Sequence, residues 1–179
     1  LENAYKIEKT DDMTTLPLYQ NGAFVVQDVS SMLAVRAVLS EDFLAEKRTA
    51  GEKLCIVDVC AAPGGKSMLA ADLLSDAGVD RIGFQVEARD ISGKKVMQTA
   101  ENFARCGFDK DSVSAVVCDA LECDEQQTAD IVIADVPCSG LGVIGKKRDI
   151  KYKITQEQFT ELVSLQRRIL EKAVKMLKP

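Results

Sequence analysis

Leu54-Cys-Ile-Val-Asp-Val-Cys-Ala-Ala-Pro-Gly-Gly-Lys-Ser, residues 54–67, decides the fold of this chain. Its first six residues form a nearly continuous apolar run, which is typical of a strand buried on both faces of a parallel sheet. Gly64 and Gly65 end the run, and a helix is predicted over Lys66–Leu74. The stretch therefore predicts a strand, a glycine loop and a helix in succession, which is the opening unit of an α/β fold.

The rest of the sequence repeats this alternation. Further strands are predicted at Ile82–Val86, Val113–Cys118 and Asp130–Ala134. Helices are predicted at Asp28–Leu39, at Ser92–Cys106 and from Thr155 onward. We expect the apolar face of the last helix to consist of Phe159, Leu162, Val163, Ile169, Leu170, Ala173, Val174 and Leu177. The pattern predicts an α/β domain with a doubly wound, mostly parallel sheet that is covered on both faces.

Composition excludes several classes of protein. A chain of 179 residues with 46% apolar residues can bury the core of one ordinary domain. No apolar run approaches the length of a membrane span, and the N-terminus does not resemble a signal peptide. Six cysteines without a Cys-x-x-Cys pair, and no histidine, argue against a disulfide framework and a zinc site. We expect a cytoplasmic, metal-free monomer.

The net charge of −5 is unevenly distributed along the chain. From Gly145 onward the balance is +6, whereas the preceding residues carry −11. A basic C-terminal segment on an acidic body is typical of a nucleic-acid footprint, although Lys172, Lys175 and Lys178 also fit a solvated helix face. The candidate RNA-binding residues are those that crowd the segment just after Cys138, namely Lys146, Lys147, Arg148 and Lys151.

Three acidic residues and a pair of glycines follow the predicted strands, where a parallel sheet binds its ligands. Gly64 and Gly65 precede a helix N-terminus, which favours a carboxylate or phosphate. Asp90 is placed to accept hydrogen bonds from a ribose diol, and Asp119 from an adenine amino group. Asp135 ends the fourth strand beside Cys138. A nucleoside cofactor explains these positions together, although Asp90 and Asp119 taken singly also fit helix caps.

Cys138 differs from the other cysteines. Pro137 fixes the turn before it, and Ser139-Gly140 after it favours exposure. Cys55 and Cys118 lie within apolar strands and fit small core residues, and no chemistry is expected of Cys106 or Cys123. Cys138 is therefore the cysteine predicted to take part in catalysis.

Two strings, Asp58–Ser67 and Asp135–Gly140, resemble the RNA (cytosine-5)-methyltransferases of the RsmB/Nop/Sun type, as do Leu141-Gly-Val-Ile and Asp149-Ile-Lys-Tyr. Phe24–Leu33 is similar to the Val-Gln-Asp segment that opens the family's catalytic domain. The resemblance covers Gly22 to Pro179. Val136 and Arg148 depart from it, since the family usually has alanine and proline there.

The resemblance implies a Rossmann-like S-adenosylmethionine-dependent methyltransferase domain over residues 22–179, preceded by a linker or the end of another domain at 1–21. It implies an RNA substrate, most simply 16S ribosomal RNA. Asp90 would bind the ribose, and Asp119 and Asp135 would complete the pocket. By similarity, the S-adenosylmethionine site would also be lined by Cys60, Ala61, Ala62, Pro63, Gly64, Gly65 and Lys66.

The resemblance also implies a division of work between two thiols. Carbon 5 of cytosine is a poor nucleophile until a thiolate adds to carbon 6. In the family the attacking thiol lies in a later Thr-Cys segment, and the Pro-Cys residue, here Cys138, assists product release. No Thr-Cys occurs in the 179 residues, so we expect a fragment that lacks the nucleophile and the last strands and is inactive alone. The alternatives are a DNA cytosine-5 methyltransferase with Cys138 as nucleophile, or a non-catalytic RNA-docking module.

Overall fold

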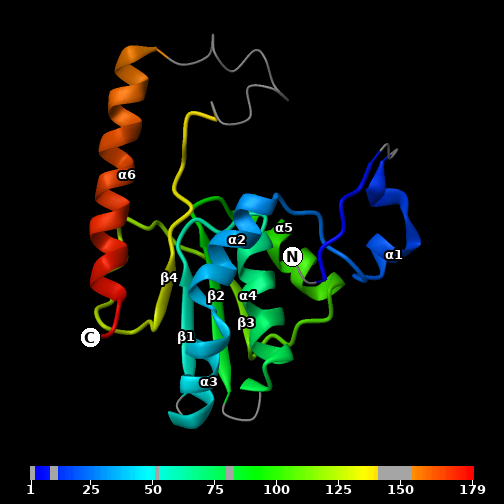
Figure 1. The fold of residues 1–179 in the computed structure, drawn as a ribbon. Helices are drawn as coiled ribbons and strands as arrows, with labels where there is room; N and C mark the ends of the chain where they lie inside the picture. Colours follow the sequence, from blue (N-terminus) through cyan, green and yellow to red (C-terminus); the bar gives the residue numbers. More distant parts are fainter. Residues whose placement is uncertain (1–2, 9–11, 51–52, 80–82, 141–154) are drawn as a thin grey trace.

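A computed structural model describes residues 3–8, 12–50, 53–79, 83–140 and 155–179. Within them four parallel strands form one sheet in the order β3-β2-β1-β4 (Figure 1). The strands are β1 (Leu54–Asp58), β2 (Phe84–Asp90), β3 (Val113–Val117) and β4 (Ile131–Ile133). Because β1 lies between β2 and β4, the strand order reverses beside β1, and sheets of this kind bind ligands at the carboxyl ends of the strands near such a reversal. The predicted parallel α/β sheet is confirmed.

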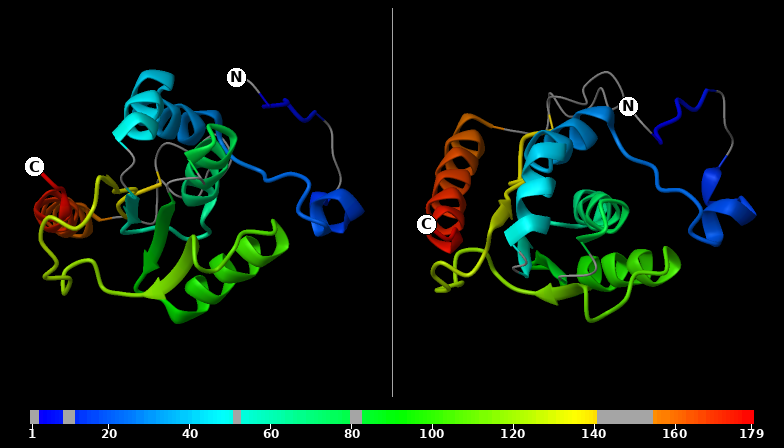
Figure 2. Two further views of the ribbon diagram at one scale, coloured as in Figure 1. Left: turned by 90° about the horizontal axis from the view of Figure 1, so that it is seen from below. Right: turned by 60° about the horizontal axis from the view of Figure 1, so that its bottom comes forward.

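Helices cover both faces of the sheet. On one face α2 (Val29–Val38), α4 (Gly65–Asp76) and α5 (Gly93–Arg105) contribute to one buried cluster. On the other face α6 (Gln156–Met176) packs against a second, smaller cluster. Figures 1 and 2 show α2 and α6 on opposite sides of β4. Strand β4 therefore lies between the two helical layers.

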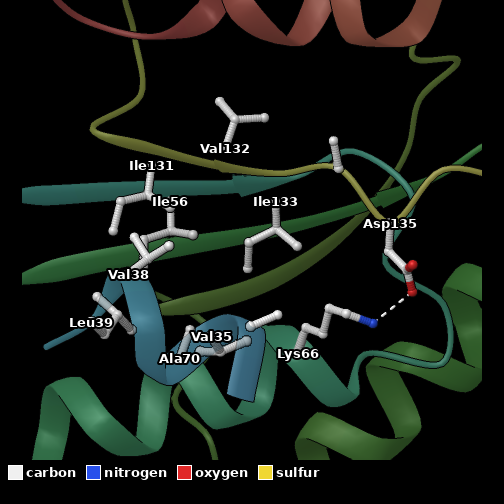
Figure 3. A pocket seen from close by; sticks show the side chains of 12 residues that line it. Val35, Val38, Leu39, Ile56, Lys66, Ala70, Ile131, Val132, Ile133 and Asp135 are labelled. Carbon is white, nitrogen blue, oxygen red and sulfur yellow. Dashed lines mark hydrogen bonds and ion pairs between the residues drawn. The ribbon is translucent and has the colours of Figure 1, made fainter. Parts of the chain in front are cut away.

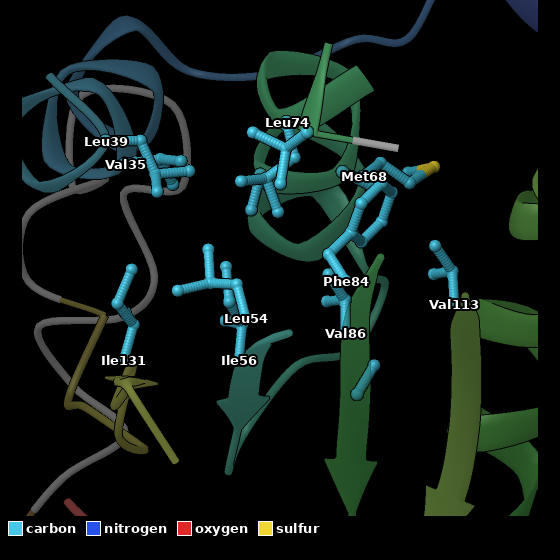
Figure 4. Close-up of a cluster of buried hydrophobic side chains, with 14 of the residues drawn as sticks. Val35, Leu39, Leu54, Ile56, Met68, Leu74, Phe84, Val86, Val113 and Ile131 are labelled. Atoms are coloured by element: carbon cyan, nitrogen blue, oxygen red, sulfur yellow. The ribbon is translucent and has the colours of Figure 1, made fainter. Parts of the chain in front are cut away.

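The apolar run of β1 is explained by burial on both faces. Leu54 and Ile56 point into the larger cluster and are each 1% exposed (Figure 4). Val57 and Val59 belong to the smaller cluster beneath α6. Successive side chains of a strand alternate between faces, so a strand covered on both sides has no polar positions to alternate with the apolar ones.

Two segments differ from the sequence-based expectation. The ladder between β2 and β3 continues to Asp90, which lies opposite Val117, so β2 ends four residues later than predicted. The polar stretch 40–53, for which no element was predicted, contains helix α3 (Glu41–Ala50). Most residues of α3 are polar because the helix contributes few side chains to the core. Leu44 is one of those few.

The predicted apolar face of α6 is wrong in part. Ile169 and Ala173 are buried as expected, and Met176, which was not predicted, is 1% exposed. A helix can turn only one stripe of its surface toward a sheet, and α6 carries apolar residues around more than one stripe. Five of the predicted residues therefore remain 38–58% exposed, namely Phe159, Val163, Leu170, Val174 and Leu177.

Two of the C-terminal lysines form ion pairs. Lys172 Nζ lies 2.6 Å from Asp124 Oδ1, and Lys178 Nζ lies 2.8 Å from Asp130 Oδ2. The Asp130 side chain is only 9% exposed and also accepts from the backbone N–H of Cys55. These two lysines thus form ion pairs with acidic side chains of the domain. They are therefore not part of a purely solvated helix face, as one interpretation of the sequence had it.

The segment before Gly22 packs against the end of α5. It contains the short helices η1 (Met13–Thr15) and α1 (Pro17–Gln20). The Arg105 guanidinium lies 4.1 Å from the centre of the Tyr19 ring and donates to the Tyr19 carbonyl. The domain boundary at residue 22 stays a prediction, but α1 and α5 are in contact across it. No helix in the described parts of the chain is long and apolar enough to cross a membrane.

Candidate cofactor and catalytic site

The carboxyl ends of the four parallel strands lie at one edge of the sheet, and the predicted site residues follow them. Asp58 ends β1 and Asp90 ends β2. Asp119 and Asp135 each lie two residues beyond their strands, β3 and β4. The topology therefore brings the four acidic residues to the same edge, and three of them, Asp90, Asp119 and Asp135, are predicted site residues.

The glycine loop after β1 is anchored by backbone hydrogen bonds. Ala61 N–H donates to the Arg89 carbonyl at 2.8 Å, and Gly64 N–H donates to the Ala61 carbonyl at 2.7 Å. Asn102 Nδ2 of α5 donates to the Pro63 carbonyl at 3.0 Å. The Ala62–Pro63 peptide is cis. The loop is thus tied both to β2 and to α5, which fixes it at the sheet edge.

Gly64 is required at its position. Its φ of +95° lies in the left-handed region, and an added Cβ would lie 2.9 Å from side-chain carbons of Thr99 and Phe103. The first turn of α4 follows directly, and Met68 N–H donates to the Gly64 carbonyl. The N–H groups before Met68 have no acceptor inside the helix. N–H groups of this kind can bind an anion such as a carboxylate.

Asp58 is buried behind the glycine loop and binds the first turn of α4. Its side chain is 1% exposed and accepts a hydrogen bond from the Ser67 hydroxyl at 2.9 Å. Burial raises the pKa of Asp58 to about 6, although the Ser67 hydroxyl, the Cys60 N–H and the charge of Lys66 each oppose that rise. Asp58 is therefore a buried support behind the loop, bonded to Ser67 of α4.

The raised pKa of Asp58 predicts a pH dependence of stability. The folded protein holds this proton more tightly than the unfolded chain, so the free energy of unfolding falls as the pH rises from 3.8 to about 6. We expect a fall of about 3 kcal/mol, at about 1.4 kcal/mol per pKa unit. Urea unfolding of wild type and Asp58→Asn at pH 4 and pH 7 isolates this contribution, because every other group titrates in both proteins. An equal pH dependence in the two would contradict it.

Asp90 and Asp119 each form a local turn through one carboxylate oxygen. Asp90 Oδ1 accepts from Ser92 N–H at 3.0 Å, and Asp119 Oδ1 accepts from Leu121 N–H at 2.9 Å. Lys95 Nζ lies 3.5 Å from Asp90 Oδ2. The N-cap of α5 is Ser92 and not Asp90. Both carboxylates thus keep acceptor capacity for a ribose or an adenine amino group.

Lys66 joins the glycine loop to β4. Its ammonium lies 2.6 Å from Asp135 Oδ2 and 3.1 Å from the Ser31 hydroxyl of α2 (Figure 3). The Lys66 side chain is 18% exposed, whereas that of Asp135 is 61% exposed. Lys66 thus forms an ion pair with Asp135. The pair holds the exposed carboxylate of Asp135 beside the glycine loop.

Cys138 is the exposed cysteine among the six. Cys60, which lies in the glycine loop, is half-buried, and burial together with the charges of Asp58, Asp90 and Asp135 raises the pKa of its thiol to about 11. Burial likewise raises the pKa of Cys118 to about 11, with Cys123 adding to the rise. The exposure predicted for Cys138 from its flanking residues is confirmed, whereas its part in catalysis stays a prediction.

A separate apolar pocket of about 290 Å³ lies between α2 and β4. Figure 3 shows apolar side chains such as Val38, Ile56 and Ile133 along it, with the Lys66–Asp135 pair at one end. Asp90 and Asp119 are not among its lining residues. The pocket therefore touches the predicted cofactor site only through that ion pair.

Some predictions lie outside what the structure describes, and some contacts were not predicted. Lys146, Lys147, Arg148 and Lys151 fall outside the described residues. No group of three or more metal-ligating side chains occurs in the described parts of the chain. Sequence reasoning missed Ser31, which accepts from Lys66, and Gln166, whose amide donates to the Pro137 carbonyl. Both are ordinary polar residues on helices, and nothing in their local sequence indicates a site.

Comparison with known proteins identifies relatives over most of the chain. The model of the family 16S rRNA methyltransferase RsmB/F matches residues 46–179. The chain is 29% identical over 183 residues to ribosomal RNA small subunit methyltransferase F of Citrobacter koseri, covering 99% of this chain and 35% of the relative. It is 30% identical over 181 residues to ribosomal RNA small subunit methyltransferase B of Shewanella oneidensis, covering 99% of this chain and 38% of the relative.

A solved structure shows the same fold. The crystal structure of NSun6 from Pyrococcus horikoshii with SFG superposes with a TM-score of 0.72 at 26% identity, over 94% of this chain and 39% of that one. The chain thus spans between about a third and two fifths of the length of these relatives. Since the family model covers most of the sequence, the chain belongs to the 16S rRNA methyltransferase RsmB/F family.

Proposed function

We propose that this chain is the cofactor-binding part of an enzyme that methylates carbon 5 of a cytosine in 16S ribosomal RNA. The observation that carries the proposal is the placement of Cys138. This exposed thiol follows β4 at the same sheet edge as the glycine loop, and Lys66 of that loop binds Asp135 three residues before it. A methyl donor in the loop and a base beside Cys138 would therefore meet at this edge.

The residues at the carboxyl ends of the strands fit S-adenosylmethionine. The N–H groups at the start of α4 suit its carboxylate, Asp90 suits the ribose diol, and Asp119 suits the adenine amino group. When bound, this cofactor supplies an electrophilic methyl group. The part played by the chain is to fix the glycine loop, through Ala61 and Gly64, and to hold the two carboxylates at neighbouring strand ends.

The chemistry on cytosine requires a thiolate at carbon 6. Bond formation there pushes electron density to carbon 5, which then becomes nucleophilic. After methylation a base accepts the proton from carbon 5, the electron pair of that C–H bond restores the double bond between carbons 5 and 6, and sulfur leaves carbon 6 as a thiolate. We assign Cys138 to this release step. The resemblance gives the attacking role to the cysteine of a Thr-Cys segment, and none occurs here, so the attacking thiol is proposed to lie outside these 179 residues.

The cofactor assignment predicts a loss of affinity in Asp90→Ala. Removing the carboxylate should leave ribose hydroxyls unpaired and weaken S-adenosylmethionine binding by about 1–3 kcal/mol, which calorimetry on this chain or on the full-length protein can measure. Asp76→Ala is the matched control, because Asp76 is exposed at the far end of α4. Equal affinities of wild type and Asp90→Ala would remove Asp90 from the site.

The substrate assignment is tested by product analysis. Full-length protein is incubated with 16S ribosomal RNA, with duplex DNA and with S-adenosylmethionine, and the nucleic acids are digested to nucleosides for mass spectrometry. The expected product is 5-methylcytidine from the RNA only. Methylated deoxycytidine from the DNA would favour a DNA enzyme, and binding of RNA without any product would favour a docking module.

A further inference from the structure

The loop 135–140 that carries Cys138 is held from both faces of the sheet. From the face of α4, Lys66 Nζ binds Asp135 Oδ2 at 2.6 Å. From the opposite face, Gln166 Nε2 of α6 donates to the Pro137 carbonyl oxygen at 2.7 Å. Figure 3 shows α4 below and α6 above the end of β4. The loop is exposed, yet side chains of two different helices hold it on either side of Val136.

The bond from Gln166 acts on the backbone of Cys138 itself. The Pro137 carbonyl and the Cys138 N–H belong to one planar peptide unit, so fixing the oxygen also fixes the direction in which the Cys138 Cα lies. The ring of Pro137 restricts the preceding φ angle. Beyond the planar peptide bond, only the φ and χ1 angles of Cys138 then separate the anchored carbonyl from the thiol.

Helix α6 is a firm support for this contact. Ile169, one helical turn after Gln166, is 5% exposed and belongs to the smaller buried cluster. Leu165 packs against the same cluster, as does Val136 of the loop. Residues next to Gln166 and next to Pro137 are thus packed in the same apolar cluster. The hydrogen bond from Gln166 to Pro137 lies at the edge of that cluster.

We infer that Gln166 is a positioning residue for Cys138: its amide holds the Pro137–Cys138 peptide so that the thiol faces the base during product release. The inference rests on the proposed role of Cys138. Gln166 itself touches neither substrate nor cofactor. Its loss should therefore slow the step that depends on Cys138 and leave S-adenosylmethionine binding unchanged.

The experiment compares Gln166→Glu and Gln166→Leu in the full-length protein. Glutamate keeps the shape of the side chain but has no N–H donor at neutral pH, and leucine removes all hydrogen bonding. The matched controls are Gln156→Glu and Gln156→Leu, because Gln156 is exposed at the start of the same helix. We expect both Gln166 variants to turn over about ten- to a hundredfold more slowly. We also expect a covalent protein–RNA adduct on denaturing gels, with unchanged cofactor affinity and melting temperature.

Three outcomes are decisive. Gln166 variants with wild-type turnover and no adduct, tested beside a Cys138→Ala protein that does form an adduct, would overturn the positioning role and leave the proposed function intact. A Cys138→Ala protein that forms no adduct would overturn the release role on which the inference rests. Slow turnover together with weaker cofactor binding or a lower melting temperature would show that Gln166 acts only through the stability of the fold.

Discussion

Cys138→Ala in the full-length protein is expected to accumulate a covalent complex with its RNA. The attacking thiol can still add to carbon 6, and the methyl group can still be transferred, but release is impaired. Steady-state methylation should fall by about a hundredfold or more, the usual contribution of a positioned side chain to a proton transfer. The complex should be visible as an RNA-dependent band of reduced mobility on a denaturing gel.

Two comparisons make this result specific. Cys106→Ala is the control, because burial raises the pKa of that thiol and it lies at the end of α5, away from the carboxyl ends of the strands. It should methylate at the wild-type rate without an adduct. If Cys138→Ala instead abolishes methylation and forms no complex, Cys138 is the attacking residue, and the division of work between two thiols is wrong.

Gly64→Ala is expected to destabilise the fold strongly and to distort the glycine loop. The left-handed conformation, with φ of +95°, costs a non-glycine residue about 1–2 kcal/mol. The new methyl group would also lie 2.9 Å from Thr99 and Phe103 of α5, and overpacking of this kind costs about 1–3 kcal/mol. Together these effects predict a loss of about 2–5 kcal/mol in the free energy of unfolding, measured with urea.

Gly107→Ala separates the two causes. Gly107 also has a positive φ, +77°, but an added Cβ there meets no atom of the described residues within 4 Å. It should show the backbone cost alone, about 1–2 kcal/mol. Equal losses in the two variants would mean that contact with α5 contributes nothing, and that the tight approach of the loop to Phe103 can relax.

Local sequence was sufficient for the first strand, the glycine loop and the following helix. An apolar run, two glycines and a helical segment are consecutive, and each depends on backbone properties of its own residues. The start of the last helix at Thr155 was predicted for the same reason, and Thr155 is the N-cap of α6, where it forms a capping box with Gln158. Local reasoning was weaker where burial depends on a partner, as in α3, whose ten residues are mostly polar.

The face of α6 that is buried could not be deduced from periodicity. The helix carries apolar residues on two stripes, and only packing on β1 and β4 selects the stripe with Ile169, Ala173 and Met176. The remaining stripe, with Val163 and Leu170, is exposed in the described structure. Helical spacing alone predicts burial of either stripe equally well.

The sequence by itself determined the order of elements and the residue types at the strand ends, including the acidic residues and Cys138, because these follow from local patterns. The tertiary structure alone decided which of them meet. Lys66 and Asp135 are 69 residues apart in the chain, and Pro137 and Gln166 are 29 apart. Contacts of this kind depend on how helices on opposite faces are placed over β4. That placement is a property of the whole packed sheet, so no local stretch of sequence specifies it.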